Sequence, residues 1–148
     1  MAASTFTVHI PFVEMLGFEL ISFDAGKAEL ALTLREELTN SREMAHGGVS
    51  MTLLDVTMAH AARSPNQPGM PESHGVVTIE MKTTFMRPGV GRLRCFGKLV
   101  HRTVTMAFCE GTILNESGSI VAQSTGTFKY VRALPPNAKK KQPLDASE

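Results

Sequence analysis

The sequence predicts an α+β fold, in which an antiparallel six-stranded sheet is wrapped around one long central helix and a short helix precedes the sheet. Residues 49–62 are apolar on almost every side, and a helix without a strongly polar face belongs inside a core. Six further runs have the residue types of strands; they span residues 18–23, 27–34, 76–86, 93–101, 106–115 and 120–131. Six strands around one apolar helix imply a sheet that curls about that helix.

The composition fits a single globular domain and gives no reason to expect nucleic acid or a membrane as a partner. The chain has 148 residues, 43% of them hydrophobic and 20% charged, with a formal net charge of +1. No apolar run reaches membrane-spanning length, and the N-terminus lacks the pattern of a secretory signal. Cys95 and Cys109 lie in strand-like runs, where we expect reduced core thiols. A cytoplasmic protein is the simplest expectation.

The first part of the chain predicts a short helix. We expect residues 1–8 to form a flexible lead-in and residues 9–133 to form the single domain. Residues 9–16 have Pro11 near their start and Gly17 just after their end, which is the usual placement of these two residues around a helix.

A hairpin and a loop follow. The run 27–34 alternates apolar and polar residues, and Asp24-Ala25-Gly26 separates it from the run before it, as in a β-hairpin. Residues 35–45 are polar without a clear period, so we expect a loop that leads into the central helix.

The central helix is predicted from Gly47 to Arg63, because Ala, Leu and Met favour helix and Pro65 follows closely. Residues 64–75 contain three prolines and are predicted to be a loop. Four strands with short breaks between them come next. From residue 134 to residue 148 the chain is rich in proline, lysine and polar residues, which predicts a disordered tail.

The candidate chemistry is concentrated around the start of the central helix. Asp55 interrupts the apolar helix, and a buried carboxylate is costly unless it is paired, protonated or open to a cleft. Gly47 and Gly48 follow His46 where the helix begins, and the free N–H groups of a helix N-terminus suit a developing oxyanion. Asn40 and His46 add polar groups beside it. Ordinary loop geometry at the glycines and a structural Asp55 are the alternative interpretations.

These residues, together with two later motifs, resemble a known family. The pattern is Asn40, His46-Gly47-Gly48 and Asp55, followed by Thr78-Ile79-Glu80-Met81 and Phe85-Met86-Arg87-Pro88-Gly89. It is similar to the hotdog-fold acyl-CoA thioesterases, and most similar to their PaaI-type branch, which is related to the hydroxybenzoyl-CoA thioesterases. The resemblance covers residues 10–132.

The resemblance implies a hydrolase that cleaves aryl- or fatty-acyl-CoA to the free acid and CoA. It implies that Asp55 acts as nucleophile or general base, that the Gly47 amide stabilises the thioester oxygen, and that Asn40 and His46 position the reactants. Gly48 and Thr78 are candidates for substrate binding, although simple alternation places Thr78 on the face of Glu80 and Lys82. Three further residues are candidates for substrate binding. Met51 and Met58 could line an acyl pocket or belong to the core, and Arg87 could meet the phosphates of the implied CoA or face only water.

The resemblance also implies that no metal or redox cofactor is needed and that the active site lies across the interface of two protomers. The uncovered sheet face and sheet edges independently favour a homo-oligomer, a homodimer or a homotetramer. Two other functions stay open at this point. One is a hotdog hydratase or dehydratase, and the other is a hotdog module that binds acyl-CoA without catalysis.

Overall fold

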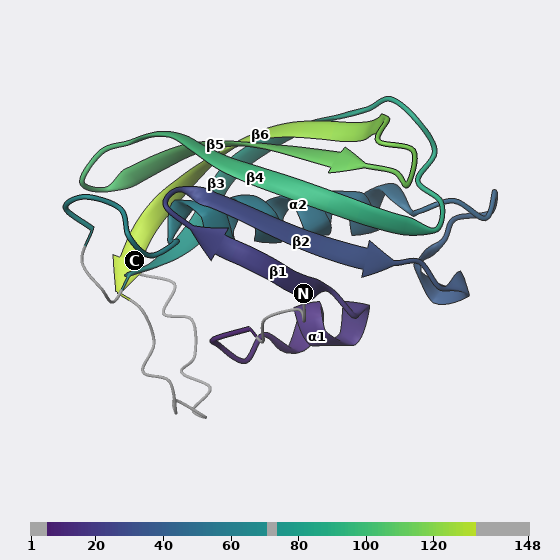
Figure 1. Cartoon of the computed structure of the whole chain (residues 1–148), viewed down its shortest axis with the longest axis horizontal. Coiled ribbons are helices and arrows are strands. Elements are labelled where there is room, and N and C mark those ends of the chain that lie inside the picture. Colours follow the sequence, from purple (N-terminus) through teal and green to yellow (C-terminus); the bar gives the residue numbers. More distant parts are fainter. Residues whose placement is uncertain (1–5, 71–73, 133–148) are drawn as a thin grey trace.

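The computed structural model describes residues 6–70 and 74–132, which fold into a six-stranded antiparallel sheet with one long helix lying along one of its faces (Figure 1). The predicted tail 134–148 and most of the predicted lead-in 1–8 lie outside the described residues. The elements are α1 (Pro11–Leu16), β1 (Glu19–Asp24), β2 (Lys27–Thr33), the 3₁₀ helix η1 (Glu36–Leu38), α2 (Gly47–Ala62), β3 (His74–Phe85), β4 (Arg92–Arg102), β5 (Met106–Leu114) and β6 (Ile120–Arg132).

The strands lie in the order β1-β2-β4-β5-β6-β3, and every neighbouring pair is antiparallel. The first hairpin therefore forms one edge of the sheet, and β3, the strand that follows α2, crosses to the other edge to pair with β6. The sheet bends around α2, while α1 lies beneath β1 (Figure 1). The predicted α+β class, the six-stranded antiparallel sheet and the short N-terminal helix are confirmed.

Local sequence explains how the first elements begin and end. Pro11 occupies the first turn of α1, and Gly17 ends the helix with φ +77° while its N–H donates to the carbonyls of Val13 and Glu14. The hairpin from β1 to β2 turns through Ala25 and Gly26 with φ +48° and +81°, the positive values that a tight two-residue hairpin turn requires.

Two of the expected loops differ from the structure. The predicted loop 35–45 contains the 3₁₀ turn η1, although the rest of it is irregular as expected. The predicted loop 64–75 is wrong at its end, because β3 already begins at His74. The cause is tertiary: β6 extends to Arg132 and pairs with His74, so its length rather than the local sequence sets the start of β3.

The core is the layer between α2 and the sheet, and two glycines let the helix come close. A side-chain carbon on Gly97 of β4 would lie 2.8 Å from the backbone oxygen of Thr57. One on Gly111, the residue paired with Gly97 on β5, would lie 3.1 Å from side-chain carbons of Leu54 and Met58. Helix backbone and sheet therefore meet almost directly, and the large side chains Leu53, Leu93, Ile113 and Phe128 fill the space around this contact.

Both cysteines, Cys95 and Cys109, are unpaired and buried on the strands β4 and β5, as predicted. Burial raises the pKa of each thiol to about 12, so both are neutral side chains of the core. Among the described residues, no helix has both the length and the apolar character needed to cross a membrane.

The close approach between Gly97 and α2 leads to a prediction about the stability of the fold. Gly97→Ala should lower the free energy of unfolding by about 1–3 kcal/mol, because the added methyl group forces α2 away from the sheet. Chemical denaturation followed by circular dichroism measures this change. Lys98→Ala, at the neighbouring exposed position, is the matched control and should change stability by less than about 0.5 kcal/mol. Equal stability of the two variants would contradict the close contact.

Candidate active site at the start of the central helix

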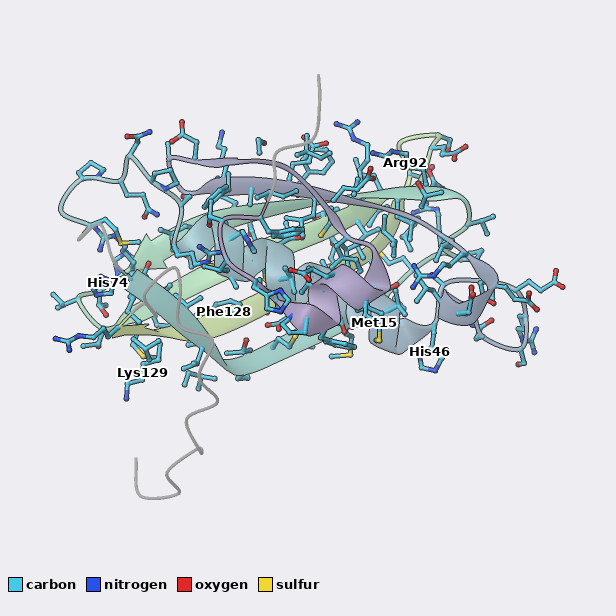
Figure 2. The ribbon with its side chains drawn as sticks, turned by 90° about the horizontal axis from the view of Figure 1, so that it is seen from below. Met15, His46, His74, Arg92, Phe128 and Lys129 are labelled. Atoms are coloured by element: carbon cyan, nitrogen blue, oxygen red, sulfur yellow. The ribbon has the colours of Figure 1, made fainter. Side chains whose placement is uncertain are left out.

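His46 caps the N-terminus of α2. Its Nδ1 accepts a hydrogen bond of 2.9 Å from the N–H of Gly48. A side-chain carbon on Gly48 would lie 3.1 Å from this Nδ1, so a glycine at this position leaves the ring room to cap the helix. Because Nδ1 accepts, the neutral imidazole carries its proton on Nε2. The ring is exposed and points away from the ribbon (Figure 2).

The N–H of Gly47 is the free donor of this helix end. It donates to no acceptor among the described residues, whereas the next three N–H groups are bonded to His46. The first turn also contains no acidic side chain that would neutralise the positive end of the helix dipole. This end of α2 can therefore receive a partial negative charge on a bound oxygen.

A cavity of about 390 Å³ opens beside Gly47, between the loop that precedes α2 and the end of β3. Most of its wall is apolar. The lining residues are Asn40, Met44, Ala45, Gly47, Ser50, Phe85, Met86, Arg87, Pro88, Gly89 and Val121. The first turn of the helix thus lines a pocket that has few polar groups.

Asn40 shapes the loop that borders this cavity. Its Oδ1 accepts hydrogen bonds from the N–H groups of Arg42 (2.9 Å) and Met44 (3.3 Å), an arrangement typical of asparagine in turns. The side-chain oxygen is therefore used by the backbone, which leaves the Nδ2 group as the donor that Asn40 can offer to a ligand.

Asp55 lies two turns further along α2, and Thr78 of β3 binds it. The Thr78 hydroxyl donates a 2.6 Å hydrogen bond to Asp55 Oδ1. The carboxyl group is half-buried, and this burial raises the pKa of Asp55 above its ordinary value, while the Thr78 hydrogen bond opposes part of the rise. The site thus holds a carboxylate that is less well solvated, and more basic, than a surface aspartate.

A β-bulge brings Thr78 to this position. Thr78 pairs with Phe128 of β6, but Glu80 pairs with the next residue, Thr127, so Ile79 has no partner of its own. The extra residue reverses the alternation of β3. Thr78 therefore shares the inner face with Met81, and the simple alternation that grouped it with Glu80 and Lys82 is wrong.

The remaining candidates lie in different surroundings. Met58 is fully buried, within 3.1 Å of the positions where side-chain carbons on Gly111 and Gly126 would lie, so it is part of the core layer. Met51 is half-buried on α2. Arg87 is exposed at the cavity rim, and its Nη1 donates to the carbonyl of Ile120 at 2.8 Å.

Phe85 and Ser50 also line the cavity, although the sequence did not mark them as site residues. Phe85 faces the start of the helix, its ring 3.5 Å from where a side-chain carbon on Gly47 would lie. Ser50 lies in the cavity wall with 3% of its surface exposed. The sequence contained a signal for Ser50, because it stands three residues after Gly47 and so one turn along on the same side of the helix. Within the described residues, no group of three or more His, Cys, Asp or Glu side chains is arranged to hold a metal ion.

The chain is similar in sequence to known proteins. The family model of the thioesterase superfamily matches residues 43–122, which include Gly47, Asp55 and Thr78. The acyl-coenzyme A thioesterase PaaI of Escherichia coli is 27% identical over 113 residues, which cover 75% of this chain and 76% of PaaI. The medium/long-chain acyl-CoA thioesterase YigI of Salmonella typhimurium is 25% identical over 141 residues, 86% of this chain and 90% of YigI.

The solved structure of the E. coli PaaI protein, from the phenylacetic acid degradation operon, superposes with a TM-score of 0.76. The superposition covers 84% of this chain and 87% of that structure at 23% sequence identity. Together with the match to the family model, this likeness confirms the expected hotdog fold.

The contact between Thr78 and Asp55 makes a prediction about the carboxyl group. Thr78→Val removes the hydroxyl and keeps the side-chain shape, so the pKa of Asp55 should rise further, because the one interaction that lowers it is lost. Carbon-13 NMR titration of the aspartate carboxyl groups measures the shift. Thr83→Val removes a hydroxyl of the same strand that contacts Ser124, and should leave the pKa of Asp55 unchanged. A fall in that pKa in Thr78→Val would contradict the assigned contact.

Proposed function

The chain belongs to the thioesterase superfamily, and from this premise we propose that it hydrolyses acyl-CoA with Asp55 as the nucleophile or general base. The observation that carries the proposal is the half-buried carboxylate of Asp55, held by the Thr78 hydroxyl on a helix whose first N–H group is free. A carboxylate with a raised pKa is the more effective base, and the free N–H is placed where negative charge can develop.

The proposed hydrolysis needs only the Asp55 carboxylate and the Gly47 N–H. Asp55 either removes a proton from a water molecule that attacks the thioester carbonyl, or attacks that carbonyl itself to form a mixed anhydride that water then opens. In both routes the carbonyl oxygen becomes negatively charged, and the Gly47 N–H stabilises it. The CoA thiolate leaves readily, so the proposal requires neither strong acid catalysis nor a metal or redox cofactor.

One helix cannot bring both groups to the same thioester. Gly47 and Asp55 are eight residues apart, which is about 12 Å along a helix at about 1.5 Å per residue, whereas a reacting carbon must lie within about 3–3.5 Å of its attacking group. We therefore propose that the active site forms across a homodimer with antiparallel α2 helices, so that Gly47 of one protomer faces the Asp55 carboxylate of its partner.

The free edge of β3 supports this dimer. β3 has twelve residues and is the outer strand beside β6, so its second edge presents unpaired backbone groups. Long unpaired edges associate with another strand unless they are covered or protected. Four large apolar residues on or just after β3 are also exposed: Val77, Ile79, Phe85 and Met86. Pairing β3 with its copy would join the two sheets and bring α2 beside its partner.

Acyl-CoA is proposed as the substrate because PaaI and YigI, the two relatives compared above, are named as thioesterases for it. The acyl group is to be identified with a panel of aryl-CoA and straight-chain acyl-CoA esters, by following release of the free thiol. We place the enzyme in the cytoplasm, which suits the buried and unpaired thiols of Cys95 and Cys109.

Asp55→Asn should reduce acyl-CoA hydrolysis by at least about 10³-fold, because the amide is neither a base nor a nucleophile. Burial raises the folded-state pKa of Asp55, so its contribution to stability is complete below the unfolded pKa and is lost as pH rises through the folded pKa. At neutral pH the variant should therefore unfold at the same temperature as the wild type or at a higher one. Thiol release and thermal unfolding provide the two measurements, and full turnover by Asp55→Asn would exclude its catalytic role.

Mixing two inactive variants tests whether the active site is shared between protomers. Gly47→Pro removes the proposed N–H donor, and proline is tolerated at the first position of a helix. His46, with φ −59° and ψ +137°, already has the extended conformation that a following proline requires. Unfolding and refolding Gly47→Pro together with Asp55→Asn creates heterodimers in which one of the two sites is intact.

The mixed sample should recover about one quarter of wild-type activity, because about half of the dimers are mixed and each has one working site. Each variant refolded alone is the control and should remain inactive. If the mixture is as inactive as its components while size-exclusion chromatography shows dimers, Gly47 and Asp55 do not share a site across the interface.

A further inference from the structure

The side chain of Ser50 is almost entirely buried, and its hydroxyl group has no partner at the cavity beside Gly47. Ser50 is 3% exposed, and among the described residues its hydroxyl makes no hydrogen bond. Two other hydroxyls of the same helix behave differently. Thr52 donates to the carbonyl of Gly48 at 2.8 Å, and Thr57 donates to that of Leu53 at 2.7 Å, the usual arrangement for hydroxyls inside a helix.

The carbonyl that would normally accept from Ser50 is already occupied. The oxygen of His46, four residues earlier, accepts from the backbone N–H groups of Val49 (2.9 Å) and Ser50 (3.1 Å). The Ser50 oxygen is also not one of the fully buried unpaired side-chain atoms of the described residues, among which stands only His74 Nδ1. The hydroxyl therefore keeps access to the cavity that Ser50 lines, and it is free to donate to a molecule bound there.

The geometry directs this hydroxyl toward the same space as the Gly47 N–H. Ser50 follows Gly47 by three residues, so the two lie on the same side of the first helical turn. Side chains of a helix lean toward its N-terminus, which brings the Ser50 hydroxyl back toward the level of the free N–H. Both residues line the 390 Å³ cavity, whose wall is otherwise mostly apolar.

We propose that Ser50 is a second hydrogen-bond donor to the thioester oxygen, acting together with the Gly47 N–H of the same protomer. This inference rests on the proposed acyl-CoA hydrolysis. No proton is transferred: the hydroxyl hydrogen stays on Ser50 and points at the oxygen, which carries a partial charge in the thioester and a full charge in the tetrahedral intermediate. The hydrogen bond strengthens as that charge develops, so it lowers the barrier more than it tightens substrate binding.

A role for Ser50 as nucleophile is disfavoured by its surroundings. An attacking serine needs a base within hydrogen-bond reach to remove its proton. In the described part of the chain the Ser50 hydroxyl contacts neither an imidazole nor a carboxylate, and the nearest titratable groups of the helix are engaged elsewhere: His46 Nδ1 with Gly48, and Asp55 with Thr78.

The test compares Ser50→Ala, Ser50→Thr and Thr52→Val with the wild type. Ser50→Ala should lower kcat by about 10²-fold, as expected for loss of one oxyanion donor, and should change KM little. The loss should be the same for every acyl group that the wild type hydrolyses, because the thioester oxygen is common to them all. Ser50→Thr keeps the hydroxyl and should recover most of the activity. Thr52→Val is the matched control, because that hydroxyl is bound within the helix, and it should leave kcat unchanged.

Two unreactive CoA derivatives supply a measurement that does not depend on turnover. In a ketone analogue a CH₂ group replaces the sulfur and the carbonyl oxygen is kept, whereas an S-alkyl-CoA thioether has no such oxygen. Calorimetry should show that Ser50→Ala loses a small part of its affinity for the ketone, in line with the small change in KM, and binds the thioether as well as the wild type does.

The possible results separate this inference from the proposed function. If the wild type hydrolyses acyl-CoA and Ser50→Ala keeps its kcat, only the role of Ser50 is overturned. A loss confined to one acyl group, or seen as a rise in KM alone, also overturns it, because it assigns the hydroxyl to the acyl chain. If the wild type hydrolyses no acyl-CoA, the proposed function fails and this inference fails with it.

Discussion

The contact between α2 and the inner face of the sheet is the constraint on which the rest of the structure depends. At Gly97 the strand backbone approaches the Thr57 carbonyl so closely that no side chain fits between them. This contact fixes the distance of the helix from the sheet and its direction. The surrounding apolar side chains can then pack in one way. Because α2 is fixed at its middle, its first turn is held against the end of β3, and Asp55 is held opposite Thr78. The positions of the functional groups therefore follow from the packing of the core.

The same helix presents two unlike chemical groups at places that one substrate cannot span within one chain. Its N-terminus offers the free N–H of Gly47 beside a mostly apolar cavity, and its middle offers a carboxylate with a raised pKa. A rigid helix cannot shorten the distance between them, and the proposed homodimer supplies a second helix. The unpaired edge of β3 and the exposed apolar residues along it are the surface through which this dimer is proposed to form. In that dimer one element would link folding and association, since β3 both supports Asp55 and forms the free edge.

Much of the fold could be predicted from local pattern, and the parts that could not depend on distant neighbours. Both helices, the first hairpin and the six strands follow from hydrophobic period and from turn residues such as Pro11 and Gly26. The start of β3 could not be predicted, because pairing with β6 sets it. At the site, Asp55 and Gly47 stand out by chemical type and by their position in an apolar helix. Three features of the site could not be predicted in this way. A bulge reverses the face of Thr78, and the His46 ring turns back to cap Gly48. The role of the Ser50 hydroxyl becomes visible only when its usual carbonyl partner is seen to be occupied.

The bulge at Ile79 places an unusual condition on the chain. Simple alternation through every residue of β3 could not keep both halves of the strand on their faces. Either Thr78 would turn away from Asp55, or Met81 would turn outward while Glu80 and Lys82 turned into the core. The backbone avoids this by accommodating at Ile79 one residue more than β6 presents. Because the pairing resumes at the next residue of β6, a deletion of Ile79 would leave a regular strand with both of its faces unchanged. β3 is therefore a strand that could lose one residue at this position and still hold Thr78 opposite Asp55.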